Sequence, residues 1–285
     1  MAMQHTPLLM SNILDRGATV APNEEIVTLT ETGVRRQTYR ETRDRAHQLA
    51  HALAGAGVKV GDRVGTFMWN GSRHLEAYHA VAGMGAVLHT LNVRLSPKDL
   101  EYIINHAEDQ VIVVDADVLP LLEVLNGKIP CVRKVVVATE EGFEGWSTEL
   151  PDPVDYEAFI EGQPTHFDWP QIDENSPMGL CYTSGTTGHP KGVEYEHRSQ
   201  YLHTLTQCMT DSMGLTGTDT VCGIVPMFHA MGWGIPWSAL MLGCKQVMPH
   251  RFMDPARLLD LMVAEKVTLS AGVPTIWQGV KGLYE

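Results

Sequence analysis

The sequence predicts an α/β fold in which layered, largely parallel sheets are flanked by helices. Short apolar runs alternate with segments of helical periodicity along most of the 285 residues. Several of these runs are continuous and β-branched rather than alternating with polar residues. Continuous runs are typical of strands buried on both faces, as parallel strands between helical layers are. A hydrophobic content of 44% suffices for one large domain or two small ones.

The order of the elements follows from periodicity and from residues that start or stop them. Ser96 is expected to cap a helix that has Pro97 at its first position and Asp99 in its first turn. Asp254 and Pro255 start a further helix in the same way. Helices are expected at 37–57, 73–86, 96–108, 196–214 and 235–243, and strands at 62–70, 110–115, 133–139, 177–182, 220–228, 245–249 and 267–274.

Most of the net charge of −13 is concentrated in one window. Residues 140–174 contain eleven acids and no Lys or Arg, while acids and bases nearly balance elsewhere. Four prolines fall in the same window. We interpret it as an exposed, irregular, acidic and Pro-rich excursion from the domain, with a solvated face favoured over a functional acidic tail.

Composition also excludes several classes of protein. No basic stripe with interleaved aromatic residues appears, so nucleic acid is not an expected partner. No run of 18 apolar residues is present, so no membrane span is expected, and the N-terminus lacks the pattern of a signal peptide. The five cysteines are scattered and have no metal-binding or disulfide spacing. A cytoplasmic enzyme with reduced thiols is the simplest interpretation.

The segment Tyr182–Gly192, YTSGTTGHPKG, concentrates groups that bind phosphate. It contains four hydroxyls and three glycines, with one cation, Lys191, near its end. Glycines adopt turn conformations that other residues avoid. Backbone N–H groups and hydroxyls in such turns can surround and bind an oligophosphate. A solvated linker has a similar composition, but the apolar run before this segment and the helical pattern after it do not suit a linker.

Spacing separates this loop from two other phosphate-binding loops. A Walker A loop has a glycine directly before its lysine and Ser or Thr directly after it, whereas Pro190 and Gly192 flank Lys191 here. A dinucleotide fingerprint requires G-x-G-x-x-G opening a helix, which is also missing.

The loop resembles the signature of the adenylate-forming superfamily, which includes acyl-CoA synthetases, luciferases and peptide-synthetase adenylation domains. That signature is [YF]-T-[ST]-G-[ST]-T-G-x-P-K-G, and all eleven positions agree. The segment 225–233, VPMFHAMGW, is similar to the aromatic-histidine motif of the acyl pocket in this superfamily. Residues 73–109 resemble the N-terminal region of bacterial medium- and long-chain fatty acyl-CoA synthetases, and the resemblance extends from about Leu9 onward.

The resemblance implies a two-step reaction. ATP and a carboxylate form an acyl-adenylate and pyrophosphate, and coenzyme A then displaces AMP to give the thioester. The implied phosphate-binding residues are Thr183, Ser184, Gly185, Thr186, Thr187, Gly188 and Lys191. Thr183 is the implied ligand of Mg²⁺, and Lys191 and His229 are the implied catalytic residues. Phe228, His229, Ala230 and Trp233 are the implied substrate-binding residues, although a core role is the alternative for His229 and Trp233.

Two features depart from the family pattern. Ala230, Met231 and Gly232 stand where relatives often have Val-Asn-Ala, so the shape of the acyl pocket is left open. The adenine, ribose and C-terminal-domain motifs of the superfamily are not found in residues 1–285. We therefore expect the chain to be the N-terminal portion of the AMP-binding domain, without the C-terminal domain, and inactive by itself. A non-catalytic nucleotide- or acyl-binding or dimerisation module of the same fold is the alternative, and a homodimer is an open possibility.

Overall fold

The computed structural model describes residues 5–140, 145–183 and 188–283. Its strands form two sheets, one with the order β12-β10-β11-β1-β2 and one with the order β7-β6-β5-β3-β4-β8-β9. Within the described residues, every pairing is parallel except those of β1 with β2 and of β8 with β9. The prediction of an α/β fold with largely parallel sheets is confirmed.

The elements have the following bounds. The five-stranded sheet contains β1 (Glu25–Leu29), β2 (Val34–Thr38), β10 (Thr220–Cys222), β11 (Lys245–Met248) and β12 (Leu269–Ser270). The seven-stranded sheet contains β3 (Arg63–Phe67), β4 (Val87–Thr90), β5 (Val111–Asp115), β6 (Lys134–Ala138), β7 (Pro153–Asp155), β8 (Pro177–Thr183) and β9 (Lys191–Glu196). The helices are α1 (Ser11–Val20), α2 (Tyr39–Gly55), α3 (Ser72–Gly83), α4 (Pro97–Ala107), α5 (Leu119–Glu123), α6 (Tyr156–Ile160), α7 (His197–Gln207), α8 (Ile235–Leu242), α9 (Pro255–Ala264) and α10 (Pro274–Lys281), with a short turn η1 (Ala230–Gly234) before α8. Of these helices, none has the length and apolar character needed to span a membrane.

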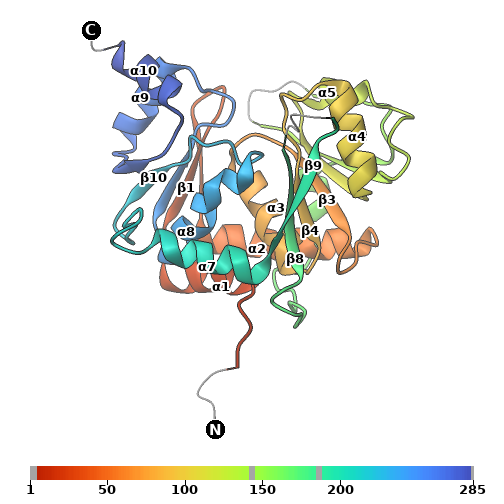
Figure 1. Ribbon diagram of the computed structural model, residues 1–285, viewed down its shortest axis with the longest axis horizontal. Coiled ribbons are helices and arrows are strands. Elements are labelled where there is room, and N and C mark those ends of the chain that lie inside the picture. The colour runs from red at the N-terminus through yellow and green to blue at the C-terminus, as the bar shows by residue number, and fades with distance from the viewer. Residues whose placement is uncertain (1–4, 141–144, 184–187, 284–285) are drawn as a thin grey trace.

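The sheets and helices stack in layers (Figure 1). The largest hydrophobic cluster joins residues of α1, α2, α3 and α8 to inward-facing residues of both sheets, so these helices form the middle layer. A second cluster packs α4 and α5 on the outer face of the seven-stranded sheet, and a third packs α9 and α10 on the outer face of the five-stranded sheet. Burial of apolar surface on both faces of each sheet is the main force that holds the layers together.

Several sequence expectations are confirmed by local structure. Ser96 accepts a hydrogen bond from the backbone N–H of Asp99, and Pro97 occupies the first turn of α4. The helix expected at 37–57 is α2, and at its start the structure adds a capping box, in which the side chains of Thr38 and Glu41 each accept a bond from the other residue's backbone. The valine-rich strands β5 and β6 are almost entirely buried, as continuous runs predict.

Other expectations of secondary structure are wrong. The residues that follow the phosphate loop form strand β9, and the helix expected at 196–214 runs only from His197 to Gln207. The strand expected at 220–228 ends at Cys222, because the chain leaves the sheet toward η1. Helix α1 and strands β1, β2 and β4 have no counterpart among the expected elements.

The acidic window is not an irregular excursion throughout. Strand β7 pairs with β6 at the edge of the seven-stranded sheet, and α6 follows it directly. Leu150, Tyr156 and Ile160 are buried and anchor this stretch in the core. The interpretation of a solvated face is therefore wrong for these residues, because their apolar side chains pack against the domain body.

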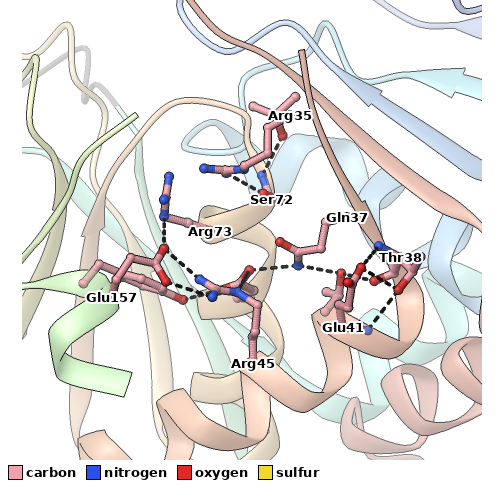
Figure 2. A network of polar contacts seen from close by, with 12 residues as sticks. Arg35, Gln37, Thr38, Glu41, Arg45, Ser72, Arg73 and Glu157 are labelled. Carbon is pink, nitrogen blue, oxygen red and sulfur yellow. Dashed lines mark hydrogen bonds and ion pairs between the residues drawn. The ribbon is translucent and has the colours of Figure 1, made fainter. Parts of the chain in front are cut away.

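The carboxylate of Glu76 in α3 is fully buried and is paired by residues from three other elements, among them Gln37 and Arg45, which Figure 2 labels. Arg45 Nε donates to it at 2.8 Å, Gln37 Nε2 at 2.9 Å and the Tyr156 hydroxyl at 2.6 Å. Burial raises the pKa of Tyr156 well above its usual value, so the phenol keeps its proton. A buried charge is tolerated only when paired and hydrogen-bonded in this way.

The acids Glu140 and Glu157 extend this network outward. Arg45 donates two bonds to Glu157, and Arg73 donates to both Glu157 and Glu140. Arg35 in β2 donates to Glu140 at 2.8 Å and thereby ties the five-stranded sheet to the end of β6. Although burial would raise the pKa of Glu157, the bonds and charges of Arg45 and Arg73 lower it to about 2 from 4.5.

We expect Glu157→Gln to lower the free energy of unfolding at pH 7. The pKa of Glu157 is lower in the folded than in the unfolded chain, so its contribution is complete above pH 4.5 and declines as the pH falls toward about 2. Because the side chain is 46% exposed, solvent screens the pairs, and the loss should be about 1 kcal/mol. Urea unfolding of both proteins at several pH values between 7 and 3 measures the difference.

Glu161→Gln is the matched control, because Glu161 is an exposed acid one turn further along. Its effect should stay within about 0.5 kcal/mol at every pH. An equal loss in both variants, or a Glu157→Gln difference that does not change with pH, would contradict the role of the ion pairs.

Candidate functional site

The phosphate-loop segment connects the two antiparallel strands of a hairpin at the edge of the seven-stranded sheet. Strand β8 pairs with β4 on one side and with β9 on the other. Thr183, the last residue of β8, lies opposite Lys191, the first residue of β9. Both residues are exposed. The structure therefore brings a hydroxyl and a cation together at the base of the loop.

Four of the predicted phosphate-binding residues, Ser184, Gly185, Thr186 and Thr187, lie outside the described residues. Gly188 is described and has a φ of +140°. A Cβ added there would meet no atom within 4 Å. Glycine is therefore favoured at this position by the backbone conformation and not by a lack of space.

The segment 225–233, the second motif, is positioned by two residues outside it. Asn70, which follows β3, donates to the backbone oxygens of Gly223 and Val225 and accepts a bond from the N–H of Met227. The hydroxyl of Tyr78 in α3 donates to the carbonyl of Met227. Both side chains are buried. Contacts with the seven-stranded sheet and with the middle helical layer thus fix the path of the chain between β10 and η1.

Turn η1 has a left-handed backbone over five consecutive residues. The φ angles are +45° for Ala230, +53° for Met231, +60° for Gly232, +56° for Trp233 and +74° for Gly234. Left-handed conformations cost residues other than glycine about 1–2 kcal/mol each. Such strain persists where the surroundings enforce it, often at ligand-binding sites.

Turn η1 packs directly on β8, which brings the two motif segments onto one strand. A Cβ added to Gly179 in β8 would lie 2.4 Å from the terminal methyl of Met231, so the strand and the turn are in close contact. Burial raises the pKa of the Cys181 thiol, and backbone N–H groups of Met231 and Ala230 oppose this shift. The exposed Thr183 lies two residues further along the same strand.

The side chains of the second motif have different environments. Phe228 is buried beside Trp69, with ring centroids 6.0 Å apart, and the guanidinium of Arg94 lies 5.8 Å from the Phe228 ring centroid. His229 and Trp233 are exposed. Exposure does not fit the alternative that His229 and Trp233 are core residues. The substrate contacts assigned to Phe228, His229, Ala230 and Trp233 stay predictions.

The structure contains a polar cavity at the point where strands of both sheets end. The sequence analysis did not predict it. Asp115 ends β5, and His250 follows β11 with its Nε2 3.3 Å from a carboxylate oxygen of Asp115. Although burial opposes the charge of His250, the carboxylate of Asp115 raises the pKa of the imidazole. Thr30 lines the same cavity with a buried hydroxyl that has no protein partner. The carboxyl ends of parallel strands are the signal that could have pointed there.

The layered fold and the β8–β9 hairpin with its loop signature point to one protein family. Residues 14–282 match the family model described as AMP-binding enzyme, and the chain belongs to that family.

Its relatives include acyl-CoA ligases from several bacteria. The chain is 44% identical over 276 residues to the long-chain-fatty-acid–CoA ligase of Thermus thermophilus, covering 96% of this chain and 49% of the relative. It is 40% identical over 279 residues to the medium-chain-fatty-acid–CoA ligase of Ectopseudomonas oleovorans, covering 98% of this chain and 51% of the relative. It is 42% identical over 279 residues to the 3-methylmercaptopropionyl-CoA ligase of Ruegeria lacuscaerulensis, covering 98% and 52%. The chain thus spans about half the length of these relatives.

Solved structures agree on the fold. The crystal structure of an anthranilate CoA ligase in complex with anthranoyl-AMP superposes with a TM-score of 0.84 at 26% identity, covering 96% of this chain and 51% of that one. A crystal structure described as a putative long-chain-fatty-acid CoA ligase from Rhodopseudomonas palustris superposes with a TM-score of 0.83 at 23% identity, covering 97% and 66%. The second match bears on the fold alone.

Replacing Ala230 by glycine should stabilise the protein slightly. Glycine relieves the left-handed strain at φ +45°, and after its larger loss of chain entropy the net gain should be up to about 1 kcal/mol. Ala80→Gly, in the middle of α3, is the control and should cost about 1 kcal/mol or more. Thermal unfolding measures both, and a loss of stability in Ala230→Gly would show that this backbone is not strained.

Proposed function

We propose that this chain is part of an ATP-dependent acyl-CoA synthetase, which joins a monocarboxylate to coenzyme A through an acyl-adenylate and releases AMP and pyrophosphate. The observation that carries the proposal is the hairpin that holds Thr183 opposite Lys191 at the base of an eleven-residue family signature. Membership of the AMP-binding family and identities of 40–44% to acyl-CoA ligases support it.

Each part of the hairpin suits one task in adenylation. The loop residues Thr183 to Gly188 offer hydroxyls and N–H groups to the β- and γ-phosphates of ATP, and the ammonium of Lys191 balances their charge. The hydroxyl of Thr183 is a hard oxygen ligand of the kind that Mg²⁺ takes when it bridges phosphates. His229 lies in the second motif and is proposed to act beside the carboxylate and the α-phosphate, where charge develops.

The proposed substrate is an aliphatic or thioether monocarboxylate of medium to long chain. Phe228 and Trp233 supply aromatic surface, and residues 225–233 contain no Lys or Arg; the guanidinium of Arg94 lies over the Phe228 ring. Relatives named for medium-chain, long-chain and 3-methylmercaptopropionyl substrates support this class.

Lys191→Ala should weaken the binding of Mg²⁺–ATP to this chain. One charge-assisted contact to phosphate would be lost, which costs about 1.5–3 kcal/mol, or roughly tenfold to a hundredfold in affinity. Isothermal titration calorimetry at low salt measures the change, since exposed charges are screened as salt increases.

Lys128→Ala is the matched control for this substitution, because Lys128 is an exposed lysine outside the hairpin. Its affinity for Mg²⁺–ATP should equal that of the unsubstituted chain. Equal affinities in all three proteins would refute the phosphate role of Lys191.

Catalysis should require more than these residues. Residues 1–285 span about half the length of the matching ligases, so we expect the chain alone to release no pyrophosphate from ATP, Mg²⁺ and fatty acid. A protein that joins it to the remaining half of such a ligase should release pyrophosphate, with medium- to long-chain monocarboxylates turned over better than amino acids or diacids. Robust acyl-CoA formation by the purified 285-residue chain would contradict this expectation.

A further inference from the structure

Both ends of the phosphate loop contact the same helix, α4. Before the loop, the hydroxyl of Tyr182 lies 2.7 Å from Nδ1 of His106. After the loop, the imidazole of His189 stacks on the ring of Tyr102, with centroids 4.4 Å apart and planes inclined by 19°. Tyr102 also stacks on His106, at 5.3 Å and 27°. These four rings form one continuous group, which we call the aromatic clamp (Tyr102, His106, Tyr182 and His189).

The clamp rests on a rigid base. One face of α4 is buried in the outer hydrophobic cluster of the seven-stranded sheet. On the inner side, the ring of Tyr182 packs on that of His89 at 5.1 Å. His89 in turn lies 2.8 Å from the carboxylate of Asp109, and both of these side chains are fully buried. Burial raises the pKa of Tyr182 to about 12, so its hydroxyl is protonated at neutral pH and can donate to His106.

The clamp lies next to the residues proposed to bind phosphate. Thr183 directly follows Tyr182, and only Pro190 separates His189 from Lys191. The ring of Pro190 fixes one backbone torsion, which limits how far His189 can move relative to Lys191 at the start of β9. His189 and Lys191 are exposed, and the stack on Tyr102 lies at the surface. Its loss should therefore leave the core intact.

We propose that His189 and Tyr102 are positioning residues for oligophosphate binding. Their stacking holds the Lys191 end of the loop against α4, so that the ammonium of Lys191 and the hydroxyl of Thr183 are directed at the same phosphate chain. This inference rests on the proposed function of the hairpin. It assigns a role to the one unrestricted position of the loop signature, at which the signature allows any residue.

Titration of the 285-residue chain with Mg²⁺–tripolyphosphate, followed by NMR, tests the proposal. His189→Ala and Tyr102→Leu should each weaken binding about three- to tenfold, the value expected for losing one aromatic pair. The double variant should be no weaker than either single variant, because both remove the same contact. His189→Phe should restore most of the affinity, since it keeps the ring and removes only the capacity for charge.

Three further measurements make the outcome decisive. His166→Ala, at an exposed histidine outside the hairpin, should bind like the unsubstituted chain. The ring-current shift of the His189 imidazole should disappear in Tyr102→Leu, which reports on the stack without any phosphate. Melting temperatures of all variants should agree to within about 2 °C, as expected for surface changes.

Each alternative result is distinct. Unchanged affinity in His189→Ala, or no ring-current shift in the unsubstituted chain, overturns the clamp and leaves the proposed function standing. Failure of His189→Phe to restore affinity also overturns it, because His189 would then contact phosphate itself. If the unsubstituted chain binds no tripolyphosphate, the proposed function of the hairpin fails, and the clamp fails with it.

Discussion

The carboxylate of Glu76 has no access to solvent, and this imposes the strictest condition on the arrangement of the domain. Its partners come from β2 (Gln37), α2 (Arg45) and α6 (Tyr156). Removal of one partner would leave a buried charge incompletely paired, which is far more costly than loss of an exposed ion pair. These elements must therefore be in place together. Since β2 belongs to the five-stranded sheet and α6 packs beside the seven-stranded one, the network also determines how the two sheets lie relative to each other.

The two motif segments, 182–192 and 225–233, depend on that arrangement. The β8–β9 hairpin is held by β4 and α4. The segment before η1 leaves the five-stranded sheet and is held by Asn70 and Tyr78. Turn η1 then packs on β8 through the contact between Met231 and Gly179. Residues outside both motifs thus set the geometry of the residues inside them, and a shift of one sheet against the other would separate the two segments.

The sequence could predict those parts of the fold that rest on local chemistry. The buried valines of β5 and β6 and the Ser96 cap of α4 are examples, because short-range patterns determine them. Strand β9 could not be predicted from the sequence, because its residues are mostly exposed and only pairing with β8 makes them a strand. The ion pairs of Glu140 and Glu157 could not be predicted from the sequence, because their arginine partners lie 67 to 112 residues away. In the same way, the loop signature predicts a role for Thr183 and Lys191, but no sequence pattern indicates that Tyr102 stacks on His189.

In the left-handed turn, the burial of one side chain accompanies the strain of the local backbone. Met231 is buried at φ +53°, and its terminal methyl occupies the space that a Cβ at position 179 would need. Burial of a thioether recovers apolar free energy that offsets the backbone strain, since fully burying a methionine side chain contributes about 1.5–3 kcal/mol. A polar side chain at the same position would need a hydrogen-bond partner beside β8. Gly179 and Met231 therefore form a coupled pair, in which a larger residue at 179 requires a smaller one at 231. Their apolar contact closes the space between β8 and η1 and holds the turn against the strand.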